Sequence, residues 1–362
     1  MARLAATSGD ARARAGLTFF EAEADRVARL CLLLARRFAA GGRLLAVGGS
    51  PQAWSDAHHV AVEFVHPVIV GKRALPALAV APEDAALVAR EDDVVLAFEP
   101  LRIAGETFEP RDDDPFVVQE LCETLYHVLW ELVHVFVEHL GTSAAGGGAS
   151  GFLYPFLERR DDDLDVVVED VRRSVLMKAE EVAALRAQTL ADGAEALEAA
   201  ATAIRGSLDS GGTVYAFGNG GSATDAMDVV ADFRAAPQGW PARRAVDLTG
   251  DPAILTALAN DIGPEVLFAR QLIAYARPGD VALAISTSGS SANIVEALAE
   301  ARRRGLATVA LVGYDGGRIA AEGLADHVVV TRSDHIPRIQ EAQASAYHVL
   351  RELVEQPGGP GP

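Results

Sequence analysis

An internal repeat constrains the fold of this 362-residue chain more than any other feature. Residues 119–133 (QELCETLYHVLWELV) and 340–354 (QEAQASAYHVLRELV) are identical at nine of fifteen positions, without a gap. A second pair, SDAHHVAVEF at 55–64 and TDAMDVVADF at 224–233, is separated by 169 rather than 221 residues. A repeated sequence specifies a repeated structural unit, so we expect a tandem duplication. The difference of 52 residues predicts that the first copy has lost about one strand–helix unit.

A glycine-rich stretch lies between the two copies. Residues 141–151 (GTSAAGGGASG) have the composition of a flexible linker. We therefore expect a degenerate first domain at 1–140 and a second domain at 152–362. In both, short apolar runs alternate with helical segments. This pattern predicts the α/β class, with two tandem doubly wound parallel sheets, flanking helices and a shortened first copy.

Composition narrows the class of partner and compartment. Lysine and arginine total 32 against 51 aspartates and glutamates, a formal charge of −19. Affinity for nucleic acid depends on clustered cations, so bulk charge argues against a nucleic-acid partner. Two cysteines are too few for a disulfide framework and fit a reducing compartment. No apolar run approaches the roughly 20 residues of a membrane span, so we expect a cytoplasmic protein without a membrane partner.

Two loops in the second copy have the character of phosphate sites. GNGGS at 218–222 and ISTSGSSAN at 285–293 each connect an expected strand to an expected helix. Glycines allow close approach of the backbone to an anion, and a helix start offers free N–H groups. Ordinary N-capping needs one hydroxyl, whereas the second loop has several. The sequence therefore favours a phosphate-binding site in the second copy.

The combination GNGGS…AND…ISTSGSSAN…RIQE…H resembles the sugar isomerase (SIS) family, and within it the phosphoheptose isomerase group. The resemblance covers nearly all of the second copy. It implies a tetrameric, often zinc-dependent aldose–ketose isomerase with active sites at subunit interfaces. The implied reaction converts sedoheptulose 7-phosphate into D-glycero-manno-heptose 7-phosphate through an enediol. Carried over position by position, the resemblance implies these substrate-binding residues: Asn219, Gly220, Gly221, Ser222, Asn260, Asp261, Ser286, Thr287, Ser288, Ser291 and Gln340.

The metal and acid–base positions differ between the copies. Where the family has His and Glu on the helix after GNGGS, the second copy has Asp228 and Asp232, although His348 is retained. An aspartate is one methylene shorter than a glutamate, so a base at Asp232 would reach less far toward a substrate carbon than the glutamate of the family. The first copy keeps all four family positions, and His, Glu and Gln are acceptable Zn²⁺ donors. The implied metal ligands are His59, Glu63, Gln119 and His127.

A non-functional interpretation of these four residues is also open. A His and a Glu four apart are commonly a surface pair on a helix, and a Tyr-His on a long helix is commonly a packing feature. The first copy also lacks the phosphate loop, because GNGGS is replaced by GGSPQAWS. Pro51 there removes a backbone donor.

The first copy lacks the phosphate loop, and the second copy lacks the His and Glu of the metal and acid–base positions. These two differences are complementary, which leads to the hypothesis of a composite site. The second copy would hold the phosphate, while Glu63 acts as base and His127 as second proton carrier. A site within the second copy would use Asp232 and His348 instead. One rival is a non-catalytic sugar-phosphate sensor or protein-binding adaptor, and another is an isomerase of a different phosphosugar. Two fused chains supply four SIS units, so we expect a homodimer of pseudo-tetrameric form.

Overall fold

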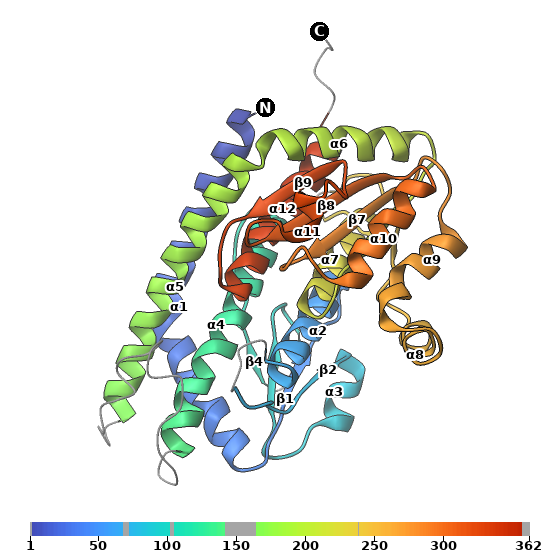
Figure 1. Ribbon diagram of the computed structural model, residues 1–362. Coiled ribbons are helices and arrows are strands. Elements are labelled where there is room, and N and C mark those ends of the chain that lie inside the picture. The colour runs from blue at the N-terminus through green and yellow to red at the C-terminus, as the bar shows by residue number, and fades with distance from the viewer. Residues whose placement is uncertain (1, 68–71, 102–104, 142–163, 238, 357–362) are drawn as a thin grey trace. The chain divides into compact units, whose positions relative to one another are not determined.

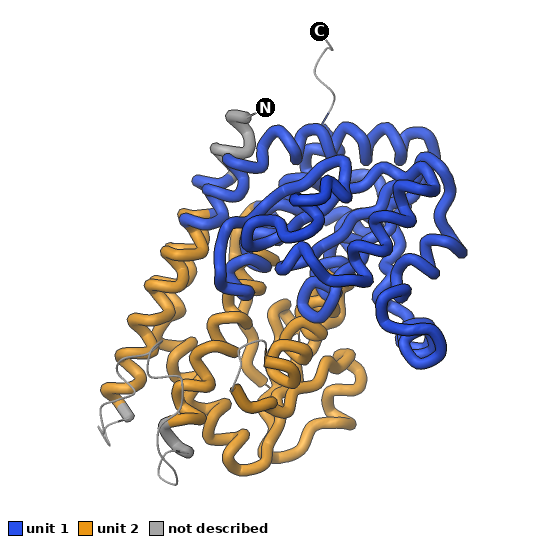
Figure 2. Tube along the Cα trace, viewed as in Figure 1, with its two compact units in different colours: residues 1–12, 114–116, 184–362 blue, residues 13–113, 117–183 orange. Residues whose placement is uncertain are grey.

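The computed structural model describes residues 2–67, 72–101, 105–141, 164–237 and 239–356 (Figure 1). The chain forms two compact units that alternate along the sequence (Figure 2). Unit 1 comprises Met1–Arg12, Asp114–Phe116 and Ala184–Pro362, and unit 2 comprises Ala13–Asp113 and Val117–Ala183. These units interleave the ranges 1–140 and 152–362, which remain a prediction about the repeat. The expected linker lies outside the described residues from residue 142 onward.

Unit 2 is built on a four-stranded parallel sheet in the order β2-β1-β3-β4. The strands are β1 (Leu44–Val47), β2 (Ala77–Val80), β3 (Val94–Ala97) and β4 (Glu106–Thr107). The helices that contribute to the unit are α1 (Ala2–Ala39), α2 (Pro51–Val65), α3 (Pro82–Val88), α4 (Pro115–Gly141) and the first part of α5 (Leu164–Asp192).

The two faces of this sheet are unequally covered. Buried side chains from α1, α2, α4 and α5 form one large apolar core against the first face. On the other face, α3 is the one helix among the described residues that contributes, and the buried core there consists of Leu45, Val47, Val80, Ala85 and Ala97. Unit 2 therefore has one thick and one thin helical layer on its sheet.

Unit 1 holds a five-stranded parallel sheet in the order β6-β5-β7-β8-β9. The strands are β5 (Val214–Phe217), β6 (Ala245–Asp247), β7 (Val281–Ser286), β8 (Ala307–Gly313) and β9 (His327–Thr331). The other elements are α6 (Ala194–Asp209), α7 (Gly221–Arg234), α8 (Pro252–Asp261), η3 (Pro264–Val266), α9 (Leu267–Tyr275), α10 (Ala292–Arg303), α11 (Gly317–Ala321) and α12 (Ile336–Glu355).

Both faces of the unit 1 sheet are thickly covered. One core joins α6, α7 and α12 to the sheet, and a second joins α9 and α10 to the opposite face. Full burial explains the continuous apolar runs of β5, β7 and β8. The predicted α/β class with two parallel sheets is confirmed. No helix in the described ranges is both long enough and apolar enough to cross a bilayer.

Unit 2 is shorter than unit 1 in three connections: between its second and third strands, between its third and fourth strands, and after the fourth. Between β2 and β3, residues 81–93 hold only α3, whereas the matching segment of unit 1, residues 248–280, holds α8, η3 and α9. In unit 1, the connection from β7 to β8 contains the twelve-residue helix α10. In unit 2, the connection from β3 to β4 runs only from residue 98 to residue 105, which is too short for such a helix. Unit 2 also passes from β4 to α4 without a counterpart of β9 in the described residues. The Ser/Thr loop and the helix after it are therefore absent at this position.

A glycine after β7 is required by backbone geometry. Gly289 has φ +59°, and a Cβ at this residue would lie 2.2 Å from the carbonyl oxygen of Gly316. Gly323 has the same φ but open space around it. We predict that Gly289→Ala costs at least about 3 kcal/mol in the free energy of unfolding, and Gly323→Ala about 1 kcal/mol. Chemical denaturation measures both, and equal losses would show that the close approach to Gly316 is unimportant.

Candidate active site

The side chains predicted as metal ligands converge inside unit 2. His59 and Glu63 lie one turn apart on α2, and His127 projects from α4. One ligand atom from each of these three side chains lies within 4.8 Å of the other two. All three are buried. His59, Glu63 and His127 therefore lie together, and the interpretation of His59 and Glu63 as a surface pair is wrong.

The distances within this cluster suit a divalent cation. His59 Nε2 lies 3.3 Å from His127 Nε2 and 3.9 Å from Glu63 Oε1. Two nitrogens bound to one tetrahedral zinc at 2.0–2.1 Å are about 3.3 Å apart. Glu63 Oε2 is buried and has no hydrogen-bond partner in the described part of the chain. A buried carboxylate oxygen beside two imidazoles is a donor set that fits a metal.

Gln119 is the fourth predicted ligand. It is buried on α4, two turns before His127, and its Nε2 finds no hydrogen-bond partner among the described residues. Its role as a metal ligand remains a prediction.

Burial sets the electrostatics of the cluster. Desolvation, and then the nearby carboxylate of Glu131, raise the pKa of Glu63 from 4.5 to about 8. Desolvation, with a smaller effect of His127, lowers the pKa of His59 well below its ordinary value. Without a cation, therefore, Glu63 holds a proton near neutral pH and His59 is neutral. A neutral imidazole is the form that binds a metal.

The corresponding positions of unit 1 form a different network. Tyr347 donates to Asp228 Oδ2 at 3.0 Å, and His348 Nε2 lies 3.4 Å from Asp232 Oδ2. The Phe116 ring stacks on His348 with centroids 4.7 Å apart. Among the described residues, no group of three His, Cys or carboxylate ligand atoms lies within unit 1 alone. Asp228, Asp232 and His348 are thus held in a buried polar network.

Arg351 reinforces this network. Its Nε donates to the backbone oxygen of Asp232 at 3.1 Å, and its guanidinium lies over the Phe233 and Trp240 rings. The matching residue of the first copy is Trp130, 221 positions earlier. A buried cation beside Asp232 is therefore specific to unit 1.

The predicted phosphate loops meet at one edge of the unit 1 sheet. Strand β5 lies between β6 and β7, and the chain order reverses there, which places a crevice beyond the carboxyl ends of β5 and β7. Asn219 and Asn293 bond to each other across this crevice through reciprocal amide contacts of 2.9 and 2.8 Å. The loops 218–222 and 285–293 are therefore neighbours.

The hydroxyls of the second loop are not used for simple capping. Ser291 is the N-cap of α10, yet its side chain makes no capping hydrogen bond. Its Oγ instead lies 3.4 Å from Ser288 Oγ, while Ser286 Oγ accepts from the backbone of Gly289. Uncapped N–H groups at a helix start with adjacent hydroxyls form a suitable anion site.

The other residues predicted to bind substrate lie at the start of α7 and on α8 and α12. Asn260 and Asp261 end α8, a helix without buried residues, and no hydrogen bond within the described ranges joins them to either loop. Gln340 is buried on α12. Gly220, at the start of α7, has φ +58°, which favours glycine. Sequence reasoning missed Asn293, although it is the last residue of the quoted motif.

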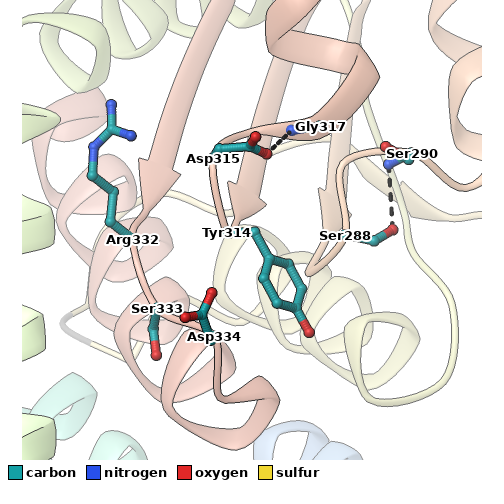
Figure 3. A pocket seen from close by; sticks show the side chains of 8 residues that line it. All are labelled: Ser288, Ser290, Tyr314, Asp315, Gly317, Arg332, Ser333 and Asp334. Atoms are coloured by element: carbon teal, nitrogen blue, oxygen red, sulfur yellow. Dashed lines mark hydrogen bonds between the residues drawn. The ribbon is translucent and has the colours of Figure 1, made fainter.

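A pocket opens beside the second loop, with a volume of about 650 Å³. Ser288 is the one predicted residue that lines it, and Tyr314 and Arg332 come from the ends of β8 and β9. Figure 3 shows the Arg332 guanidinium directed away from the other side chains. The full lining is Ser288, Ser290, Tyr314, Asp315, Gly317, Arg332, Ser333 and Asp334. Ser290 lies within the quoted ISTSGSSAN motif, whereas the segments that follow β8 and β9, which supply the other lining residues, were not singled out from the sequence.

Unit 2 fills its equivalent crevice with its own carboxylate. Its order reverses between β1 and β3, and the turn after β1 leads into α2. Glu99 Oε1, just beyond β3, accepts from the backbone N–H of Gly49 and, at 3.2 Å, from that of Ser50. A negative oxygen at a helix start takes the place that a phosphate oxygen would occupy. At this turn of unit 2, therefore, a carboxylate of the chain itself accepts from the N–H groups at the helix start.

We predict that Glu99→Gln destabilises unit 2 by about 1–2 kcal/mol, because two charge-assisted hydrogen bonds at a helix start are weakened. Thermal melting measures the loss. Glu83→Gln, in the first turn of α3, is the matched control with a small expected effect. Equal effects of the two variants would show that the contacts of Glu99 contribute nothing.

The pKa of Glu63 predicts a pH dependence in chelator-treated protein. The folded state keeps a proton that the unfolded state has lost, so stability falls as pH rises through the folded pKa of about 8. Between pH 7 and 8.5 we expect a loss of about 1 kcal/mol. Glu63→Gln should remove this component. A parent and variant with the same pH slope would contradict the assigned protonation.

Comparison with known proteins identifies the family. Residues 179–313 match the SIS domain model. The phosphoheptose isomerase of Chlorobium phaeobacteroides is 43% identical over 179 residues, which are 48% of this chain and 78% of that protein. The phosphoheptose isomerase of Solidesulfovibrio magneticus is 40% identical over 188 residues, which are 52% of this chain and 91% of that protein.

A solved structure shares the fold over most of the chain. The C-terminal domain of glucosamine-fructose-6-phosphate aminotransferase from Francisella tularensis aligns with 94% of this chain and 93% of its own, with a TM-score of 0.55 and 10% identity. The identity of the relatives over most of their length, together with the SIS domain, shows that this chain belongs to the phosphoheptose isomerase family of aldose–ketose isomerases.

Proposed function

We propose that this protein is a phosphosugar aldose–ketose isomerase that interconverts sedoheptulose 7-phosphate and D-glycero-manno-heptose 7-phosphate. The observation that carries the proposal is the buried cluster of His59, Glu63 and His127 in unit 2. Its counterpart in unit 1 consists of Asp228, Asp232 and His348, tied to Tyr347 and Arg351. The proposal treats the chain as a tandem duplication whose two copies divide the work.

Unit 1 would bind the phosphate end of the substrate. Ser288 is exposed and Thr287 and Ser291 are half-buried, so their hydroxyls are available at the start of α10. The phosphate is remote from the reacting carbons, and its binding energy serves to orient them. The equivalent turn of unit 2 is unsuitable for this role, because the Glu99 carboxylate already accepts from its N–H groups.

Unit 2 would carry out the proton transfers. Conversion of the ketose requires removal of a proton from C1 and its return to C2, while a second proton moves between the two oxygens. Glu63 is the proposed carbon base, because its carboxylate lies in the buried cluster with the two imidazoles. His127 is the proposed carrier of the proton that moves between the oxygens.

The proposed cofactor is Zn²⁺ held by His59, Glu63 and His127, with Gln119 as the fourth ligand. A bound zinc ion would polarise the substrate carbonyl and stabilise negative charge on its oxygens. The support for this assignment is the geometry of the donor set and the buried oxygen of Glu63.

One observation favours a sensor or adaptor instead. His59, Glu63 and His127 are at most 2% exposed, and a catalytic base must reach the substrate carbon. A sensor would bind the sugar phosphate without turnover. An assay with sedoheptulose 7-phosphate and Zn²⁺, together with calorimetric binding, separates the two functions. Parallel assays with hexose and pentose phosphates test the rival substrates.

We predict that Glu63→Gln lowers kcat at least about 100-fold, because the carbon base is removed. Ser288→Ala should mainly raise KM, by about tenfold. Asp232→Asn, at the matching helix position of the other copy, is the control and should keep most of the activity. The reverse pattern, with activity lost in Asp232→Asn and kept in Glu63→Gln, would place the chemistry in the second copy.

We also predict a homodimer in solution, which would combine four SIS units in two chains. Light scattering coupled to size exclusion measures the mass, with about 76 kDa expected from twice the 38.1 kDa chain. A mass of one chain would contradict this assembly.

A further inference from the structure

Tyr126 contacts the first imidazole of the cluster. It lies on α4 directly before His127, and its Oη is 2.9 Å from His59 Nδ1. Both side chains are buried, at 3% and 2% exposure, and their rings pack with centroids 4.9 Å apart. A single residue of α4 therefore bridges to α2 beside the proposed ligands.

The opposite nitrogen of the same ring faces the cluster. His59 Nε2 is the atom that lies 3.3 Å from His127 Nε2 and 3.9 Å from Glu63 Oε1. An imidazole offers a lone pair at Nε2 only when its hydrogen is on Nδ1. We infer that Tyr126 is a positioning residue whose Oη accepts the Nδ1–H of His59 and so directs the Nε2 lone pair to a divalent cation. This inference rests on the metal site of the proposed function.

Unit 1 provides an independent observation of the same tyrosine contact. Tyr347, at the matching position of α12, donates to Asp228 Oδ2 at 3.0 Å, and Asp228 matches His59. The tyrosine is thus retained in both units while its partner changes from imidazole to carboxylate. A hydroxyl both donates and accepts, so it serves either partner. Both units therefore share a hydrogen bond between this tyrosine and the same helix position, although the side chain at that position differs.

The test is Tyr126→Phe in the full-length protein, with Tyr347→Phe as the control that removes the same hydroxyl from the other unit. Affinities for Zn²⁺ and Co²⁺ are measured by competition with a chromophoric chelator. We expect Tyr126→Phe to weaken binding by about 10- to 100-fold, because partners of this kind orient metal-bound histidines. Tyr347→Phe should leave the affinity unchanged.

A spectroscopic readout separates orientation from a general loss of folding. In the Co²⁺-loaded parent, NMR should show a slowly exchanging imidazole N–H from His59, and this signal should be lost or exchange rapidly in Tyr126→Phe. Equal affinities and the same protected N–H in parent and variant would overturn the inference while leaving the metal site intact. A parent that binds neither ion would overturn the metal site as well.

Discussion

Two imidazole nitrogens held 3.3 Å apart inside a protein need something between them, either a shared hydrogen or a shared cation. In unit 2 this contact joins α2 to α4, and a carboxylate with a pKa raised by burial lies beside it. Burying an ionised carboxylate costs free energy unless an opposite charge or a hydrogen bond compensates for it. A divalent cation would satisfy the two nitrogens and the carboxylate together, and it would make the ionised form of Glu63 favourable.

The two units use one arrangement of strands in opposite ways. Each has a crevice where the strand order reverses, beyond the carboxyl ends of neighbouring parallel strands. In unit 1 the crevice is bordered by hydroxyls and an uncapped helix start, while in unit 2 the Glu99 carboxylate occupies it. The helix positions differ in the reverse sense, since unit 2 has the histidines and unit 1 has aspartates tied to Tyr347 and Arg351. Each unit thus lacks what the other retains.

Much of this was predictable from the sequence. The alternation of apolar runs and helical segments predicted both parallel sheets, and the matched segments around Tyr126 and Tyr347 indicated which helices correspond. The convergence of His59, Glu63 and His127 followed from the spacing of four on one helix and from the family resemblance.

Other features depend on contacts that no local pattern records. Glu99 has no motif around it, and its role arises only because β3 lies beside β1. Arg332 and Tyr314 line a pocket because two strand ends meet there. The interleaved units also could not be read from composition, since α5 begins after the expected linker yet contributes to the core of unit 2.

Crystals of the protein grown with Zn²⁺ and sedoheptulose 7-phosphate, with diffraction recorded on both sides of the zinc absorption edge, test the division of labour most directly. The account predicts one anomalous peak per chain, bonded to His59, Glu63 and His127, and a phosphate group on the hydroxyls of residues 286–291. A peak at Asp228, Asp232 and His348, or a phosphate bound at the turn beside Glu99, would contradict it.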